Sequence, residues 1–239
     1  MLNRLLNLLY PRRCPICDDI VIPKGNLVCD SCKDILTPLR EPLCYKCGRQ
    51  IFSSDREYCD TCLNYNFSFD KAFSLWPYNH TVKSSLSNFK YKGRREYANY
   101  YGSKLCEHYS SLIKSLNIDV IIPVPVHRER LKDRGYNQAM LIASDLSKRL
   151  SIPLAGDYLI RSKNTVAQKN LDPIERRKNL REAFSINKPS TYYSSYIRSV
   201  LLIDDIYTTG STANACAAVL KEAGAKNVYV LCMASVRAT

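Results

Sequence analysis

The chain has 239 residues, of which 46% are hydrophobic and 24% are charged, as in an ordinary folded protein. This composition excludes a wholly disordered or collagen-like chain. No run of 18 apolar residues is present, so we expect no membrane insertion. The 35 basic residues exceed the 22 acidic residues to give a net charge of +13, and residues 1–66 hold only 9 basic and 8 acidic side chains. The basic remainder indicates an anionic partner, either ligand phosphates or nucleic acid, although a solvated basic surface explains the charge equally well.

The first ten residues, MLNRLLNLLY, carry four leucines on one face of a helix. Polar residues interrupt this run, two arginines follow it, and no small-residue cleavage site is present, so the segment lacks the pattern of a secretory signal. We expect a short amphipathic helix that docks on the rest of the protein, and a cytoplasmic location. Thiols stay reduced in the cytoplasm, which favours metal binding over disulfides.

Eight of the eleven cysteines lie in the first 62 residues as four C-x-x-C pairs that begin 15 residues apart: Cys14/Cys17, Cys29/Cys32, Cys44/Cys47 and Cys59/Cys62. Each pair can offer two thiolates from one tight knuckle, and two knuckles complete a tetrahedral shell with no open position. A segment of this length buries little core, so bound metal would supply its stability. The spacing predicts two structural Zn²⁺ ions.

The simplest pairing is sequential, with the first four cysteines around one ion and the last four around the other, but spacing alone also allows an interleaved pairing. Iron–sulfur clusters, a disulfide framework and a redox-active pair are the alternatives to zinc; the even spacing of the knuckles favours zinc. We assign residues 1–66 to an N-terminal helix and double zinc ribbon, and residues 67–239 to a second domain. The low net charge of the ribbon argues against its being the main nucleic-acid surface.

The second domain begins with a predicted strand at residues 71–78. Apolar residues at Leu86 and Phe89 follow, and then a basic turn over residues 90–95. Tyrosines and leucines recur at helical spacing over residues 96–116, which predicts a helix whose tyrosines face the core rather than form a stacking platform.

A strand, a basic loop and a helix are predicted next. Residues 119–126 form a short apolar run, typical of a strand buried on both faces of a parallel sheet. Residues 127–137 are polar and basic, and we interpret them as a loop. Residues 139–150 have the apolar spacing of an amphipathic helix.

The same order returns near the end of the chain. Residues 200–203 predict a buried strand, with Asp204 and Asp205 at its carboxyl end. A hydroxyl-rich turn over residues 207–212 leads into a helix that stops at Gly224, and residues 227–234 predict another buried strand. Alternating strands and helices predict an α/β fold with a mostly parallel sheet flanked by helices.

The turn after the acidic pair has the chemistry of a phosphate site. Ligands of open α/β sheets bind beyond the carboxyl ends of the strands, and the backbone N–H groups that begin a helix bind anions. Gly210 lets the backbone approach closely, and four hydroxyl residues surround it: Thr208, Thr209, Ser211 and Thr212. The adjacent Asp204 and Asp205 are poor phosphate ligands but good acceptors for vicinal hydroxyls. Together these groups suit a ribose 5-phosphate, and the Walker pattern is absent.

The run VLLIDDIYTTGST, residues 200–212, resembles the phosphoribosyl-pyrophosphate (PRPP) signature of type I phosphoribosyltransferases. The rest of the chain is similar to the ComF family of bacterial competence proteins. The supporting segments are PRRCPIC with the double zinc ribbon, FKYKGRREYA, PVPVHRERLKDRGYNQA and QKNLDPIERRKNLREAF. The resemblance covers essentially the whole chain and implies a type I phosphoribosyltransferase fold behind the ribbon.

The resemblance also implies roles for residues. Asp204 and Asp205 would hold the ribose hydroxyls, and Thr208, Thr209, Gly210, Ser211 and Thr212 would cradle the 5-phosphate. Arg130 and Arg134, in and after the turn at residues 125–130, would meet the pyrophosphate, whereas Mg²⁺ would be carried mainly by PRPP and water. Residues 161–184 would form a mobile loop over the site, or else an exposed charged helix; this segment contains Gln168, Glu175, Arg176, Arg177 and Arg181.

Three functions compete at this point. The first is transfer of phosphoribosyl from PRPP to an unidentified nitrogen nucleophile, with no general base among His80, His108 and His127, although His127 is a candidate ligand contact. The second is a PRPP sensor without catalysis. The third is a nucleic-acid-binding zinc protein whose ligand fold is now scaffold, which the intact acidic pair disfavours. The family implies a role in competence, with single-stranded DNA and DNA-uptake proteins as partners.

Overall fold

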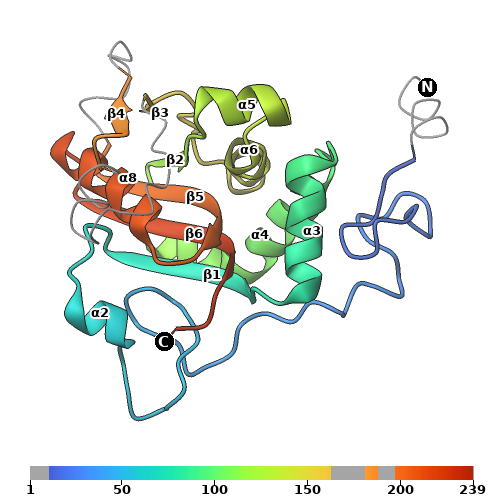
Figure 1. The fold of residues 1–239 in the computed structure, drawn as a ribbon, viewed down its shortest axis with the longest axis horizontal. Coiled ribbons are helices and arrows are strands. Elements are labelled where there is room, and N and C mark those ends of the chain that lie inside the picture. The colour runs from blue at the N-terminus through green and yellow to red at the C-terminus, as the bar shows by residue number, and fades with distance from the viewer. Residues whose placement is uncertain (1–10, 163–180, 188–196, 239) are drawn as a thin grey trace.

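A computed structural model describes residues 11–162, 181–187 and 197–238 (Figure 1). The helices of this part are α2 (Asp60–Asn64), α3 (His80–Tyr91), α4 (Tyr97–Ser115), α5 (Arg128–Arg134), α6 (Gln138–Leu150) and α8 (Ser211–Glu222). The strands are β1 (Lys71–Pro77), β2 (Val120–Pro123), β3 (Leu159–Arg161), β4 (Phe184–Ile186), β5 (Ser199–Tyr207) and β6 (Asn227–Ser235). The helix predicted for residues 1–10 lies outside the described residues.

Four strands form a parallel sheet in the order β1-β6-β5-β2. Its two central strands are almost wholly apolar at their middles, and Val200 to Ile203 have no exposed surface. A strand covered by helices on both faces requires this unbroken apolar run, which is why periodicity could identify it. The predicted α/β class with a parallel sheet is confirmed.

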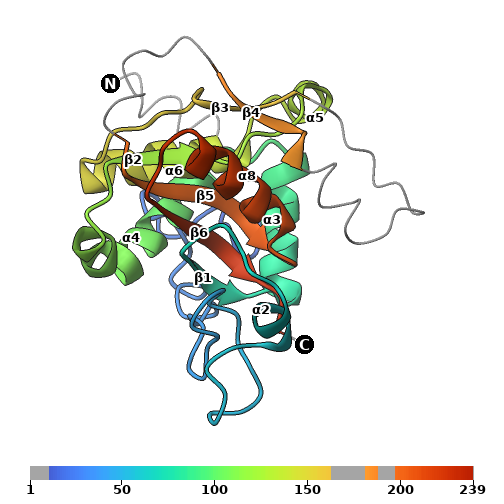
Figure 2. The same cartoon turned by 90° about the vertical axis from the view of Figure 1, so that its left-hand side faces the viewer.

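In the described part of the chain, the sheet separates α8 on one face from α3, α4 and α6 on the other (Figure 2). Alternate residues of β5 point to opposite layers: Val200 and Leu202 pack in the core with α8, and Leu201 and Ile203 pack in the core with α3, α4 and α6. The predicted core-facing tyrosines of α4 are confirmed, since Tyr97, Tyr100 and Tyr101 are all buried in the second of these layers.

The basic segment after β2 differs from its prediction. Residues 127–137 were expected to form a loop, but residues 128–134 form α5. The His127 side chain accepts a hydrogen bond from the Glu129 amide at the start of this helix, and Gly135 ends it with a φ of 73°. None of the residues of α5 is buried, so the helix has no apolar periodicity by which sequence analysis could detect it.

The strand that carries the acidic pair is longer than predicted. Sequence periodicity ended it at Ile203, but β5 continues to Tyr207, because residues 204–207 keep pairing with β6 after the apolar run ends. Asp204 stands opposite Cys232, and Tyr207 opposite Ser235. The two carboxylates therefore lie within the last part of a central strand.

The segment expected to cover the site begins and ends in a small second sheet. Strands β3 and β4 pair antiparallel, with Arg161 opposite Phe184. Residues 163–180, which include Gln168, Glu175, Arg176 and Arg177, lie outside the described residues. Arg181 is described and forms an ion pair with Glu222 of α8, with both side chains largely exposed.

Candidate functional site

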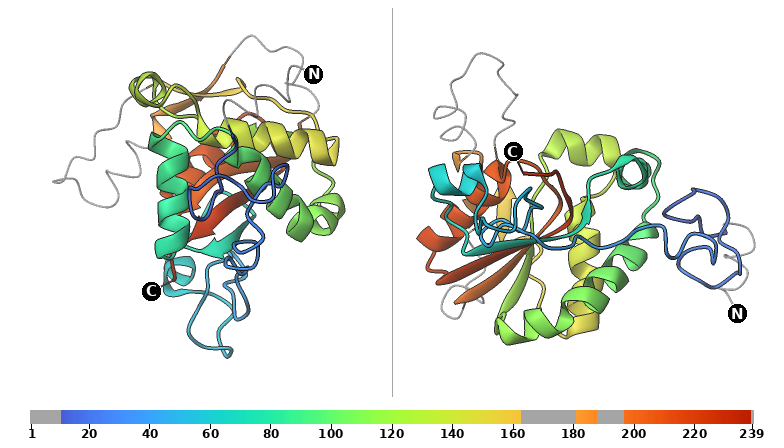
Figure 3. Two further views of the ribbon diagram at one scale, coloured as in Figure 1. Left: turned by 90° about the vertical axis from the view of Figure 1, so that its right-hand side faces the viewer. Right: turned by 90° about the horizontal axis from the view of Figure 1, so that it is seen from below.

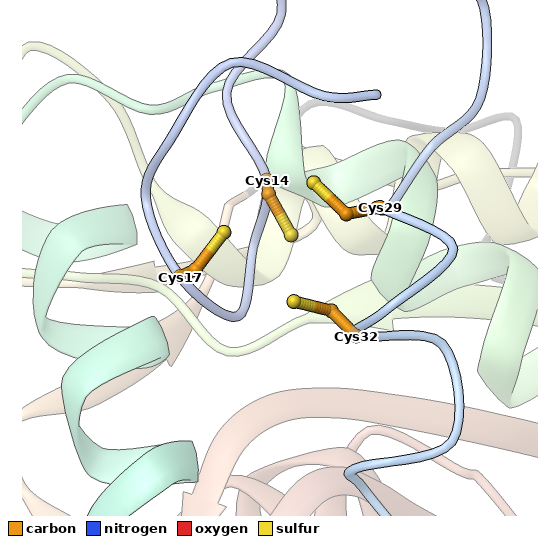
Figure 4. A group of neighbouring side chains, drawn as sticks. All are labelled: Cys14, Cys17, Cys29 and Cys32. Carbon is orange, nitrogen blue, oxygen red and sulfur yellow. The ribbon is translucent and has the colours of Figure 1, made fainter. Parts of the chain in front are cut away.

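The eight N-terminal cysteines form two separate clusters. Figure 4 shows the first, in which Cys14, Cys17, Cys29 and Cys32 direct their sulfurs toward one common point. The other four make the second cluster, and in each cluster the four Sγ atoms lie within 4.8 Å of one another: Cys44, Cys47, Cys59 and Cys62. The pairing is sequential, and the interleaved alternative is excluded.

Both clusters fit zinc. A tetrahedral site with Zn–S bonds of about 2.3 Å has an S···S edge of about 3.8 Å, and the Cys47 and Cys59 sulfurs are 3.7 Å apart. All eight cysteines have free thiols, so the disulfide framework is not formed. Four sulfur ligands in each cluster are consistent with two structural zinc ions.

The two ribbons repeat each other with an offset of 30 residues. The β-bridge Arg13↔Ile20 of the first becomes Leu43↔Gln50 in the second. The knuckle hydrogen bond from the Cys14 amide, 2.7 Å to Asp19 O, has its counterpart at the Cys44 amide, 2.9 Å to Arg49 O. Asp18 and Gly48 occupy equivalent positions with positive φ angles of 62° and 66°. The shared backbone lets each position be compared directly between the ribbons.

The ribbons contact different parts of the α/β domain, and Figure 3 shows the first beside α3 and the second near α2 and the C-terminus. In the first, Asp18 Oδ1 accepts hydrogen bonds from Arg94 Nε at 2.8 Å and the Tyr97 hydroxyl at 2.7 Å. Burial alone would raise the pKa of Asp18, but the hydrogen bonds from Tyr97, Arg94 and Lys92 outweigh it and lower this pKa to about 2. The first ribbon is thereby joined to the start of α4.

The second ribbon packs on the edge strand of the sheet. The Ala72 amide of β1 donates to Lys46 O at 2.8 Å, and the Ala238 amide donates to Gln50 O at 3.0 Å. A Cβ on Gly48 would lie 2.5 Å from Ala72 O, so the knuckle reaches the strand only because this residue is glycine. Its buried cysteines belong to the same core as Phe67 and Phe69. The division of the chain at residue 66 stays a prediction.

The acidic pair of β5 contacts a lysine from α3. Lys90 forms an ion pair with Asp205, and these side chains are only 17% and 16% exposed. The Asp205 amide donates to Asp204 Oδ1 at 2.8 Å. Burial raises the pKa of Asp204 to about 8, the charge of Asp205 adds to this rise, and Lys90 opposes it. The pair is therefore two unlike carboxyl groups, one neutralised by an ammonium and one whose protonated form is favoured.

The predicted phosphate loop lies directly after this strand. Gly210 caps α8 with a φ of 77°, and a Cβ there would collide with the Tyr207 hydroxyl. Thr208 and Thr209 are exposed, and Thr209 Oγ1 lies 2.8 Å from Ser211 Oγ. The loop thus presents hydroxyls and the first amides of a 12-residue helix to one side of the sheet.

Two residues missed by the sequence analysis fix the surroundings of this loop: Asn214 fixes the start of α8, and Arg49 contacts the loop itself. Asn214 of α8 accepts a hydrogen bond from the Ser68 amide at 2.6 Å and donates one to the Tyr65 hydroxyl at 3.0 Å. Arg49 of the second ribbon donates to Thr208 O at 3.4 Å. The 30-residue repeat could have pointed to Arg49, because the two ribbons differ in charge at this position: the equivalent residue of the first ribbon is Asp19. Lys90 was also missed. It lies in the basic segment after Phe89, but the sequence of that segment does not indicate that Lys90 contacts Asp205.

The two predicted pyrophosphate ligands point to different neighbours. Arg134 donates to Gln138 Oε1 at 3.1 Å and to the Tyr91 hydroxyl at 3.2 Å, with its guanidinium 5.0 Å from the Tyr91 ring centroid. Arg130 is exposed on α5. Burial lowers the pKa of Arg161 on β3, and the nearby charge of Arg130 lowers it further. Arg130 therefore lies on the side of β3, and Arg134 on the side of α3.

Comparison with known proteins gives a family match and several relatives. Residues 5–63 match the double zinc ribbon domain. Competence protein F of Haemophilus influenzae is 39% identical over 112 residues, 47% of this chain and 48% of that protein. Competence protein ComFC of Bacillus subtilis is 32% identical over 151 residues, 63% of this chain and 58% of that protein. The DNA utilization protein YhgH of Escherichia coli O157:H7 is 35% identical over 115 residues, 48% of each chain.

Solved structures similar to this chain include two phosphoribosyltransferases. The purine enzyme from Pyrococcus horikoshii is 20% identical, with a TM-score of 0.35 over 58% of this chain and 72% of that one. The adenine enzyme from Saccharomyces cerevisiae is 17% identical, with a TM-score of 0.36 over 63% and 73%.

Two further facts bound these comparisons. None of the helices in the described part of the chain is long and apolar enough to cross a membrane. The chain matches only about half of the length of its curated relatives, from 48% to 58%. Within those bounds, the chain carries a double zinc ribbon at its N-terminal end and is similar to competence proteins F and ComFC over about half of their length.

Proposed function

We propose that Asp204, Asp205 and the loop at residues 208–212 bind PRPP together with Mg²⁺. One observation carries this proposal: a pair of carboxylates in the last part of a central parallel strand leads into a left-handed glycine that caps a 12-residue helix. Carboxylates accept hydrogen bonds from vicinal hydroxyls, and a helix start with free amides binds phosphate. A ribose 5-phosphate offers both groups with the right connectivity.

The charges of the site support this reading. Two adjacent carboxylates would repel a phosphorylated ligand, but Lys90 neutralises Asp205 and burial favours the protonated form of Asp204. The 5-phosphate would accept hydrogen bonds from the amides and hydroxyls of residues 208–212. Arg130 and Arg161 add positive charge on the side of β3, where the pyrophosphate would lie, and Mg²⁺ would come with the pyrophosphate and its water.

The reaction we propose is transfer of phosphoribosyl to a nitrogen nucleophile. The bond from C1 of the ribose to the pyrophosphate breaks, the bond to nitrogen forms, and inorganic pyrophosphate leaves. Positioning and charge neutralisation would do most of the catalysis, through the arginines and the loop amides. Sensing of PRPP without transfer uses the same groups and is the alternative at this site.

The biological setting is proposed from the relatives. Their names are competence proteins and a DNA utilization protein, so we propose a cytoplasmic role in the uptake or use of incoming DNA, with DNA-uptake proteins as partners. The basic excess after residue 66 is compatible with a nucleic-acid partner.

A second candidate function, binding of single-stranded DNA, is favoured by a basic and aromatic surface beside the acidic pair. Tyr91 is 68% exposed, follows Lys90 directly and has the Arg134 guanidinium over its ring, and Arg95 lies nearby, 4.9 Å from the centroid of the buried Tyr136 ring. An exposed aromatic ring flanked by cations suits a stacked base and a phosphate backbone. Tyr91→Ala should weaken binding of a fluorescent oligothymidylate, and the affinity should fall linearly in log salt.

Calorimetric titration with PRPP and Mg²⁺ tests the primary proposal. We expect binding by the wild-type protein and none by Asp204→Asn/Asp205→Asn, while Asp133→Asn/Asp157→Asn, which removes two exposed carboxylates, binds normally. Pyrophosphate release on addition of nucleobases or amines would then separate a transferase from a sensor. Undiminished binding by the first double variant would refute the assignment of the acidic pair.

A further inference from the structure

Arg49 is a buried arginine that touches both the second cysteine cluster and the predicted phosphate loop. Only 4% of the residue is exposed. Its guanidinium donates hydrogen bonds of 3.4 Å to Cys47 Sγ and 3.4 Å to Cys59 Sγ, and one of 3.1 Å to Thr61 Oγ1. A further hydrogen bond of 3.4 Å reaches Thr208 O, at the start of the loop. The Arg49 side chain therefore links the sulfurs of the second cysteine cluster to the predicted phosphate loop.

The ribbon fold itself does not require this arginine. In the 30-residue repeat, the equivalent position in the first ribbon is Asp19, which is exposed. Both ribbons still form the same knuckle, because the carbonyls of Asp19 and Arg49 accept the same hydrogen bond from Cys14 and Cys44, respectively. Arg49 is thus an addition to the second ribbon alone, the ribbon that faces the loop.

The buried positive charge of Arg49 is stabilised only when the second cysteine cluster carries negative charge, as it does with zinc bound. A buried guanidinium is costly unless anionic partners surround it. A zinc ion with four thiolates carries a net charge of about −2, which offers such a partner at the sulfurs. When the metal leaves and the sulfurs become thiols, that counter-charge is gone. Without that counter-charge, the buried position in which the guanidinium donates to the Thr208 carbonyl is no longer favoured.

The loop is fixed from a second side by its own neighbours. The Tyr207 ring lies under Gly210, and Arg49 is 5.9 Å from the centroid of that ring. Within the described residues, the first ribbon contributes no hydrogen bond to this arrangement; its Asp18 accepts hydrogen bonds from Lys92, Arg94 and Tyr97 around the start of α4. The two cysteine clusters therefore differ in what the loss of each one disturbs.

We propose that Arg49 is a positioning residue through which the second cysteine cluster holds residues 208–212 in shape for a phosphorylated ligand. The affinity of the loop then depends on the second metal site and not on the first. The identity of the ligand rests on the proposed function, but the positioning of the loop does not. Loss of metal from the second site, for example to a chelator, then lowers ligand affinity at a distance.

The test compares Arg49→Gln with Asp19→Asn, its counterpart in the first ribbon, in the full chain. Zinc content is measured first, and then hydrogen exchange of the peptide that spans residues 205–216. We expect faster exchange of this peptide in Arg49→Gln and no change in Asp19→Asn. In the zinc-loaded Arg49→Gln protein, PRPP affinity should fall about tenfold, the size expected for a lost hydrogen bond from a charged donor. Arg49→Lys, which keeps the charge, should restore part of the protection.

Cobalt substitution supplies a signal that a merely structural role would not produce. PRPP should shift the thiolate-to-cobalt absorption of the wild-type protein, because coupling between the two sites is reciprocal. The shift should survive in Cys17→Ser, which disables the first site, and vanish in Arg49→Gln.

The outcomes are distinct. A wild-type protein that binds no PRPP refutes the proposed ligand, and the exchange comparison still decides the positioning role. Normal exchange in a zinc-loaded Arg49→Gln protein overturns the role of Arg49 whatever the ligand. If Arg49→Gln does not fold, Cys47→Ser and Cys17→Ser replace it, and equal exchange of residues 205–216 in these two variants overturns the proposal.

Discussion

Lys90, near the end of α3, and Asp205, near the end of β5, form an ion pair that joins two elements separated by more than a hundred residues. The pair sets a cation between a helix and the acidic end of the central strand. Because both side chains are largely buried, water screens their attraction only in part. The ammonium therefore governs how much negative charge the acidic pair presents to a ligand.

Removal of this ammonium should weaken ligand binding. In Lys90→Met, the charge of Asp205 is no longer neutralised and repels the phosphates, so we expect PRPP affinity to fall about tenfold. Lys83→Met, which removes an exposed lysine from the same helix, is the control and should bind normally. Calorimetry of both variants checks this, and equal affinities would mean that Lys90 only joins α3 to the sheet.

The raised pKa of Asp204 predicts a pH dependence of stability. Burial and the charge of Asp205 raise this pKa from 3.8 to about 8, opposed by Lys90. Between these values the folded state binds more protons than the unfolded state, so Asp204 lowers the free energy of unfolding progressively as the pH rises from about 4 to about 8. Asp204→Asn removes this titration. Its stability relative to wild type should therefore increase over that range.

Urea denaturation of the two proteins at about pH 5.5 and about pH 8, with zinc present, measures this difference. The comparison between variants cancels the pH dependence that both share, including that of the cysteine clusters. A constant difference at the two pH values would contradict the raised pKa.

Gly210 is the residue that should tolerate substitution least at the loop. Its φ of 77° strains any side chain, and a Cβ would collide with the Tyr207 hydroxyl and lie 3.2 Å from the Phe67 ring. We expect Gly210→Ala to lose about 1–3 kcal/mol of stability and most of its PRPP affinity, while it retains two zinc ions. Gly224→Ala has a φ of 106° but open space around its Cβ, so it controls for backbone strain. PRPP binding that is lost equally in both variants would refute a specific role of the loop.

Sequence analysis identified the features whose signal lies within a single short segment. The apolar run at residues 200–203 identified a central strand, and the spacing of the knuckles identified the metal ligands, because both signals lie within one segment. The roles of Lys90 and Arg49 were not predicted, because each depends on a contact with a residue more than a hundred positions away in the sequence: Asp205 and Thr208, respectively. The helix α5 was not predicted for another reason: none of its residues is buried, so its sequence has no periodic pattern of apolar residues.

The zinc content of the protein tests whether the two cysteine clusters bind metal independently. We expect two zinc ions per wild-type chain, and one each in Cys17→Ser and Cys62→Ser, because each substitution removes one ligand from a different cluster. Cys106→Ser changes a cysteine outside both clusters and should retain two. Elemental analysis of purified protein measures this. Loss of both ions in a single-ligand variant that remains folded would contradict independent sites.

Two neighbouring tyrosines of α4 should respond in opposite ways to the same substitution. The Tyr97 hydroxyl donates hydrogen bonds to Cys14 O at 2.9 Å and to Asp18 Oδ1 at 2.7 Å. Tyr97→Phe leaves both acceptors short of a donor and should lower the free energy of unfolding by about 1–3 kcal/mol. The Tyr100 hydroxyl is buried and finds no hydrogen-bond partner among the described residues, so Tyr100→Phe should be neutral or stabilising.

Thermal and urea denaturation of these two variants separate the hydrogen bonds from the packing, since each change deletes one oxygen from a ring buried in the same core. Tyr97→Phe also takes a donor from Asp18, so the pKa of that carboxyl should rise from about 2 toward its usual value. The first ribbon should then loosen from the start of α4 while the second, which shares none of these contacts, keeps its hydrogen-exchange protection. Equal stability losses in the two variants would show that the Tyr97 hydroxyl does not join the first ribbon to the α/β domain.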